Sequence, residues 1–134
     1  MLKSDFEHLA QIRVREARLL LAGHEFDGCY YLAGYAVEAA LKACIAKATR
    51  RFEFPDKDRA NRVFTHDLAR LLQAAELVVE MRNEAVGLQE KWALVLKWTV
   101  DARYSVGKPH DVAADFLDAA AGRGGIIPWL KRHW

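Results

Sequence analysis

The sequence predicts an all-α fold, and three observations lead to this prediction. Hydrophobic residues make up 52% and charged residues 28% of the 134 positions, a balance that lets a chain of this length close a single core. Alanine, leucine, glutamate, lysine and arginine dominate long stretches, whereas glycine and proline are sparse. Apolar residues also recur at spacings of three and four. We therefore expect one domain over residues 1–134, an antiparallel up-and-down bundle of about five helices.

The first helix is predicted to begin near Ser4. Ser4 and Glu7 have the spacing of a capping box, in which each side chain satisfies a backbone N–H group at the start of a helix. Apolar residues of helical period follow at Phe6, Leu9, Ala10, Ala17, Leu20 and Leu21. The helix should run to about Ala22, with Gly23 as its stop and HEFDG, residues 24–28, as the turn.

The second helix, CYYLAGYAVEAALKACIAK at residues 29–47, is rich in small side chains. Its apolar stripe consists of Ala33, Ala36, Val37, Ala40, Leu41, Cys44 and Ile45. Small side chains let helix axes approach closely, so we place this helix at the centre of the bundle and expect Gly34 to be there for its size. Glu38 and Lys42 are read as a surface pair one turn apart. Cys29 and Cys44 lie too far apart on one helix for a disulfide and are expected to be reduced.

Residues 50–64, RRFEFPDKDRANRVF, read as a charged loop. The segment from Lys42 to Arg62 has seven lysines and arginines against three acidic residues, an excess of four positive charges. Such an excess is an electrostatic footprint suited to phosphates, and it makes Arg50 and Arg51 candidate RNA-binding residues. A solvated helix end and loop would have the same composition.

A third helix should start in THDLARLLQAAE, where Thr65 is the predicted cap and Asp67 lies in the first turn. It continues, with or without a break, through LVVEMRNEA, and Gly87 marks the next interruption. LQEKWALVLKWTV, residues 88–100, then restarts a helical pattern.

Pro109 ends that helix at the latest, and Asp111 is a candidate N-cap for the next one, HDVAADFLDAAAG. Three glycines, at 122, 124 and 125, separate it from a short tail, IIPWLKRHW. The four tryptophans are interpreted as core or interface anchors: Trp92, Trp98, Trp129 and Trp134.

The segment DARYSVGKPHD, residues 101–111, has the features of a candidate active site. We expect Arg103 and His110 to face each other across a loop that contains Gly107 and Pro109. A permanently charged guanidinium and an imidazole that titrates near neutrality are the usual parts of a phosphodiester-cleaving site. Two further pairs have similar spacing, Arg18 with His24 and Arg59 with His66. Only the pair in this segment spans a Gly- and Pro-containing loop between helices, where both side chains should be exposed.

Three segments carry a resemblance to a known family: YYLAGYAVEAALKACIAK, THDLARLL, and WTVDARYS with a histidine soon after it. From about His8 to Leu130 the chain resembles the HEPN family, the higher eukaryotes and prokaryotes nucleotide-binding domain. The resemblance implies an all-α up-and-down bundle that pairs as a two-fold dimer. It also implies a metal-independent ribonuclease whose signature is Arg, four to six residues, His, often a toxin paired with a small nucleotidyltransferase antitoxin. Other members keep the fold without the activity.

The resemblance places the catalytic signature on Arg103 and His110, with a six-residue gap at the long limit of the pattern. A second form of the signature begins at Arg82 and Asn83, but Gly87 stands where its histidine would be. Secondary candidates for the site or for RNA binding are Tyr104 and His66. We favour a buried position in the bundle for Tyr104 and a helix-start role for His66.

Several function classes find no support in the sequence. Neither the two cysteines nor the five histidines cluster at metal-ligand spacing, and there is no phosphate-binding loop of the Walker type and no nucleophile elbow. We therefore expect no metal and no cofactor. No apolar run approaches the roughly 18–20 residues that span a bilayer, and no secretory signal is evident, so we expect a cytosolic protein. A net charge of +2 is too small to identify a nucleic-acid binder.

Two functions remain open, ahead of a third, which is a purely structural dimerisation domain. The first is an endoribonuclease that acts as a homodimer, because the aromatic-rich final segments offer more apolar surface than a small bundle covers. The alternative is a non-catalytic module that binds nucleotide, RNA or a nucleotidyltransferase partner.

Overall fold

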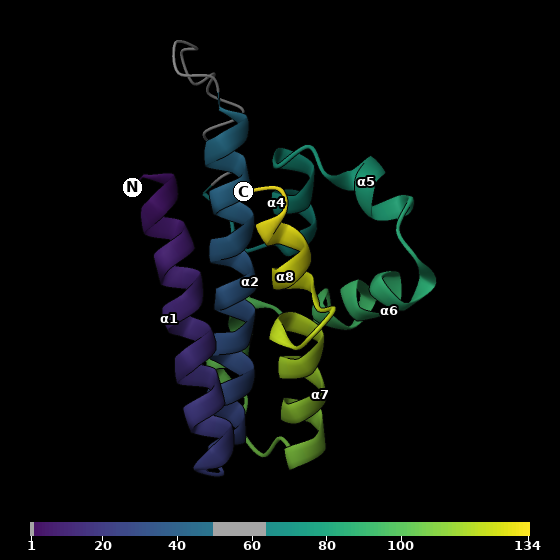
Figure 1. Ribbon diagram of the computed structural model, residues 1–134. Helices are drawn as coiled ribbons and strands as arrows, with labels where there is room; N and C mark the ends of the chain where they lie inside the picture. Colours follow the sequence, from purple (N-terminus) through teal and green to yellow (C-terminus); the bar gives the residue numbers. More distant parts are fainter. Residues whose placement is uncertain (1, 50–63) are drawn as a thin grey trace.

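The computed structural model describes residues 2–49 and 64–134, and within these ranges the regular secondary structure is entirely helical. Two long helices, α1 (Lys3–Ala22) and α2 (Phe26–Ala48), form an antiparallel hairpin whose members contact each other along their length (Figure 1). The shorter elements follow in order: α4 (Leu68–Ala74), α5 (Val78–Arg82), α6 (Val86–Val95), the 3₁₀ helix η1 (Val100–Tyr104), α7 (His110–Ala121) and α8 (Ile126–Lys131). The predicted all-α bundle is confirmed.

Helix α2 is the centre of the bundle, as its small side chains predict. It contacts α1 on one side and α4, η1, α7 and α8 on the others. Twelve of its residues are buried, and six of these are alanine or glycine: Ala33, Gly34, Ala36, Ala39, Ala40 and Ala43. Short side chains let several helices reach one axis at once, and α2 is thus the element against which these five pack.

Gly34 is required by the close approach of Trp98. A Cβ atom on Gly34 would lie 2.1 Å from Cε2 and Nε1 of the Trp98 indole, a distance that no real contact reaches. Trp98, Trp92 and Trp129 are buried, and Trp134 packs partly buried against the core. The interpretation of the tryptophans as packing anchors therefore holds for these four positions.

The ends of the first two helices differ in part from the predictions. Helix α1 ends at Ala22 as expected, but at its start the Asp5 carboxylate accepts a hydrogen bond from the Leu2 N–H group (2.8 Å), so the predicted Ser4–Glu7 capping box is wrong. Helix α2 begins at Phe26, three residues before the predicted start, and only a short turn precedes it. There His24 has a positive φ of 63°.

Three boundaries in the second half of the chain were also misplaced. Asp67, and not Thr65, is the N-cap of α4, because its carboxylate accepts from the N–H of Arg70 (3.1 Å). Gly87 lies inside α6 and causes no interruption there. Pro109 is the N-cap of α7, so Asp111 is already in the first turn and its predicted capping role is wrong.

The break after α4, left open by the sequence, occurs at Ala75–Leu77, where Glu76 has a φ of 60°.

No described helix combines the length and the hydropathy that a bilayer crossing requires.

Candidate functional site

The loop between η1 and α7 is anchored to the start of α2 by one carboxylate. The two carboxylate oxygens of Asp27 accept hydrogen bonds from the backbone N–H groups of Gly107 and Lys108, both at 2.9 Å. The N–H of Lys108, followed by that of Gly107, holds the pKa of Asp27 below its usual value. The Lys108 ammonium lies 4.6 Å from the centre of the Tyr30 ring on α2. The loop between Arg103 and His110 therefore has a fixed attachment midway along its length.

His110 is exposed as the sequence predicts, and it is the first residue of α7 rather than a loop residue. Its Nδ1 atom lies 2.9 Å from a carboxylate oxygen of Asp111, and its ring meets Phe26 edge to face at 5.4 Å. A carboxylate oxygen accepts a hydrogen bond, so the Nδ1 atom carries the hydrogen and the other ring nitrogen, Nε2, is the one available to a ligand.

Arg103 and Tyr104 form an exposed pair on η1. The guanidinium carbon of Arg103 lies 4.8 Å from the centre of the Tyr104 ring, a cation–π arrangement. Tyr104 is 73% exposed, so the prediction that it is a buried bundle tyrosine is wrong. The physical reason is the short η1 helix, in which only Ala102 is buried and Val100 packs partly buried against the core.

The structure does not bring Arg103 and His110 into contact within one chain. On α2, the ring of Phe26 contacts His110, whereas Tyr35 is the residue whose pKa is lowered by the charge of Arg103. Phe26 and Tyr35 are nine residues apart on one helix, about 13 Å along its axis at 1.5 Å per residue. Arg103 and His110 are both exposed, and each has its own set of neighbours.

His66 belongs to a polar cluster that sequence reasoning missed. Its Nδ1 atom lies 2.6 Å from a carboxylate oxygen of Glu38, and the Lys42 ammonium lies 3.5 Å from the other oxygen. Glu38 is only 5% exposed, so it is a buried charge and not half of a surface pair. The predicted helix-start role for His66 is wrong, because Asp67 caps α4.

Tyr35 joins this cluster to Arg103. Its ring packs edge to face on His66 at 5.8 Å and on Trp98 at 5.4 Å. Burial raises the pKa of Tyr35 to about 12, the hydrogen bond with Tyr31 adds to this rise, and the positive charge of Arg103 opposes it. The phenol is therefore protonated at neutral pH and stands within electrostatic reach of the guanidinium.

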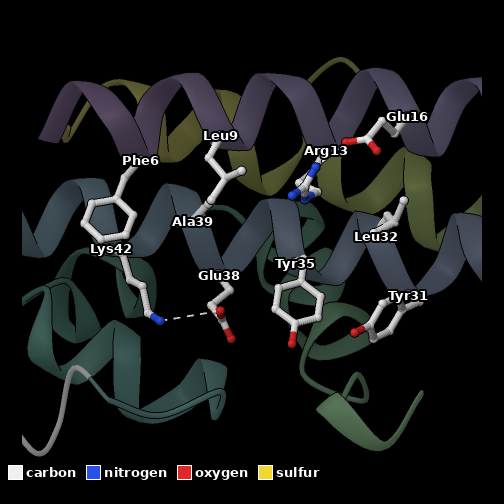
Figure 2. Close-up of a pocket in the computed structure, with 10 residues that line it drawn as sticks. All are labelled: Phe6, Leu9, Arg13, Glu16, Tyr31, Leu32, Tyr35, Glu38, Ala39 and Lys42. Carbon is white, nitrogen blue, oxygen red and sulfur yellow. Dashed lines mark hydrogen bonds and ion pairs between the residues drawn. The ribbon is translucent and has the colours of Figure 1, made fainter. Parts of the chain in front are cut away.

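Figure 2 shows Tyr31, Tyr35, Glu38 and Lys42 projecting from the same side of α2. Their spacings of four, three and four residues are the signal that could have revealed this face in the sequence.

The remaining candidates contribute little to either cluster. Arg50 and Arg51 lie outside the described residues. Arg18 donates to the backbone oxygen of Ala121 (3.3 Å), and His24 stacks on Phe26, so that pair is part of the packing between helices. Arg82 is an exposed residue at the end of α5. Over residues 2–49 and 64–134, no three His, Cys, Asp or Glu side chains are grouped so that they could hold a metal ion.

Comparisons with known proteins identify one family. A family model described as HEPN domain matches residues 8–122, most of the chain and all of the elements from α2 to α7. Searches among curated proteins and among solved structures found no match.

Proposed function

This chain belongs to the HEPN domain family, and from that premise we propose that it is a metal-independent endoribonuclease whose catalytic residues are Arg103 and His110. The observation that carries the proposal is the fixing of the His110 imidazole. Asp111 holds the Nδ1 atom at 2.9 Å, Phe26 supports the ring, and Nε2 is left to meet a substrate.

The chemistry is transesterification within RNA. A base removes the proton of a 2′-hydroxyl, that oxygen attacks the adjacent phosphorus, and the 5′-oxygen leaves as it receives a proton. The Nε2 atom of His110 accepts or returns a proton in these steps, since a histidine imidazole can act both as a general base and as a general acid. The Arg103 guanidinium pairs with two non-bridging phosphate oxygens and stabilises the charge that develops on them.

Separation of the two residues within one chain supports a dimeric site. Within the described chain the neighbours of His110 are Phe26 and Asp111 and that of Arg103 is Tyr104, and no hydrogen bond joins the two residues. A two-fold dimer would place the Arg103 of one chain beside the His110 of the other and would so form two equivalent sites, each with one guanidinium and one imidazole. The loop between η1 and α7, which Asp27 of α2 anchors at Gly107 and Lys108, would hold Arg103 and His110 in fixed positions.

In its biological setting, the protein would be a toxin or defence component controlled by a nucleotidyltransferase antitoxin. This part of the proposal rests on the family, in which such pairs are common. Co-purification with the product of an adjacent nucleotidyltransferase reading frame is its test.

The alternative is a non-catalytic HEPN module that binds a nucleotide, RNA or a nucleotidyltransferase. The absence of a contact between Arg103 and His110 within the described chain favours it if no dimer forms.

The deciding experiment incubates purified protein with labelled single-stranded RNA in excess chelator. The parent should cleave, and Arg103→Ala and His110→Ala should each lower the rate by about 10²–10⁴-fold while the helical circular dichroism stays unchanged. Arg82→Ala, an exposed arginine at the end of α5, is the matched control and should cleave normally. A parent without activity on any RNA would support the non-catalytic module, and equal cleavage by His110→Ala would remove the assigned site.

A further inference from the structure

The Glu38–His66 pair lies outside the catalytic pair and is costly to build. Glu38 is the only charged residue classed as buried among those the structure describes. Burial of a carboxylate is unfavourable unless partners compensate for its lost hydration. Lys42, one turn along α2, already supplies a cation at 3.5 Å, yet the closer partner is the imidazole of His66 at 2.6 Å. The pair therefore does more than neutralise a charge, because it fixes the orientation of an imidazole.

The orientation determines what the exposed side of His66 can bind. Since the carboxylate oxygen accepts, the Nδ1 atom of His66 carries the hydrogen, and in the neutral ring Nε2 is an acceptor. The His66 side chain is 49% exposed, and no described residue makes a hydrogen bond to Nε2. A hydroxyl group is the ligand that such an acceptor suits.

A groove opens beside this imidazole. It has a volume of about 670 Å³, within the range of small-ligand sites, and its walls include His66, Phe64, Leu96, Trp98 and Val100. Phe64 is 87% exposed and offers an unpartnered aromatic face. We call this the His66 groove. Among the described residues that line it, Asp67 alone has a carboxylate, which caps α4 and lies 3.8 Å from the Arg70 guanidinium.

Positive charge lies at one end of the groove. Val100, a lining residue, begins η1, and Arg103 follows three residues later on the same short helix. Tyr35 relates His66 to Arg103, since its ring contacts His66 and the charge of Arg103 lowers the pKa of its hydroxyl. An aromatic face and a hydroxyl acceptor thus line the groove, and a guanidinium lies one turn of η1 beyond its wall residue Val100. These are the groups that recognise base, ribose and phosphate in single-stranded RNA.

We propose that the His66 groove holds one ribonucleotide of a single-stranded RNA, with the base on Phe64, the 2′-hydroxyl donating to Nε2 of His66 and the phosphate directed toward Arg103. This inference rests on the proposed function for its RNA substrate and adds a binding subsite to it. It also assigns a role to the buried carboxylate, because Glu38 fixes the tautomer that lets His66 distinguish a ribose from a deoxyribose.

The test uses two labelled eight-nucleotide strands that the protein cannot cleave. One is DNA throughout, and the other is the same strand with a single ribonucleotide at its 3′ end, which has a 2′-hydroxyl but no phosphodiester beyond it. Fluorescence anisotropy should show that the parent binds the ribonucleotide strand about three- to tenfold more tightly, the effect of one hydrogen bond. Adenosine 5′-monophosphate should compete weakly, because it lacks the rest of the strand.

Variants separate the groups that make the subsite. His66→Ala should bind both strands equally, and the isosteric Glu38→Gln should reduce the preference, because an amide no longer dictates which ring nitrogen carries the hydrogen. Phe64→Ala should weaken the binding of both strands by about tenfold and keep the preference for the ribonucleotide strand, since base stacking does not involve the sugar. His8→Ala, an exposed histidine on α1, is the matched control and should behave as the parent.

Each outcome decides one question. Equal affinity of the parent for the two strands, no binding of either strand, or a preference that survives in His66→Ala would overturn the subsite. Adenosine 5′-monophosphate that binds as tightly as the ribonucleotide strand would identify a free-nucleotide site and would also overturn it. Cleavage is measured separately, so a parent that shows the preference but cuts no RNA contradicts only the proposed catalysis.

Discussion

Gly34 lies against the indole of Trp98 so closely that a Cβ atom would stand 2.1 Å from the ring. Helix propensity alone predicts that Gly34→Ala stabilises α2 by roughly 1 kcal/mol. We expect the opposite sign, a loss of about 1–3 kcal/mol in the free energy of unfolding, because the buried indole must move. Urea denaturation measures the difference.

Gly87→Ala is the control for this change. Gly87 also lies within a helix, α6, but a Cβ atom added there would meet open space, with no described atom within 4 Å outside the adjacent backbone. That variant should gain up to about 1 kcal/mol. A stable Gly34→Ala protein would mean that Trp98 is free to relocate.

The attachment of the loop between η1 and α7 depends on the charge of Asp27. Its pKa is lowered by the N–H groups of Lys108 and Gly107, so the attachment contributes stability above the unfolded value of 3.8 and is lost as the pH falls through the lower folded value. The Gly107 and Lys108 amide resonances should therefore shift together with a midpoint below pH 3.8 and stay constant near neutrality. NMR titration checks this, and a midpoint at or above 3.8 would contradict it.

Asp27→Ala tests the same attachment at neutral pH. Removal of both acceptors should leave the helices intact while hydrogen exchange at Gly107 and Lys108 becomes faster. Asp115→Ala, an exposed carboxylate on α7 with no such contact, should leave the exchange unchanged. Under the proposed function, Asp27→Ala should also lower the cleavage rate, because Arg103 and His110 lose their common support.

The two cysteines should be unreactive in the folded protein. Burial raises the pKa of Cys29 and of Cys44 to about 11, so only about one thiol in a thousand is ionised at pH 8. Their α-carbons are fifteen residues apart on α2, about 22 Å, which excludes a disulfide between them. A chromogenic disulfide reagent should detect both thiols rapidly only after guanidinium is added, and rapid labelling of the native protein would contradict their burial.

The sequence was sufficient for features that depend on periodicity and size. The all-α class, the central place of α2 and the end of α1 at Ala22 follow from apolar spacing and small side chains, which act locally. Features that depend on contacts distant in sequence were not predictable. Glu38 read as a surface residue because its partner, His66, is 28 positions away, and Tyr104 read as buried because nothing local indicated how short η1 is.

The predicted helix caps were wrong for a related reason. Ser4, Thr65 and Asp111 all have the right chemistry to cap a helix, but the helices begin one or more residues away from them. Several polar residues compete at each helix start, and tertiary packing selects among them. The separate surroundings of Arg103 and His110 were not predictable either, since Tyr35 lies 68 positions before Arg103 and Phe26 lies 84 positions before His110.

A composite site requires that the chain associates. We expect light scattering at micromolar concentration to give twice the mass of the 15.2 kDa chain. A mass that stays monomeric across the concentration range would remove the dimeric site and favour the non-catalytic module.

The strictest test of the dimeric site mixes two inactive chains. If the Arg103 of one chain works with the His110 of its partner, a dimer of one Arg103→Ala chain and one His110→Ala chain has one site with both residues intact and one with neither. Random reassociation makes half of the dimers mixed, so the mixture should recover about a quarter of the parental RNA cleavage although each variant alone is inactive. If the pair instead acts within a single chain, every site in the mixture lacks one residue and no activity returns. Co-expressed chains with different tags, purified in sequence through both, would give the mixed dimer directly, and its activity should be about half that of the parent.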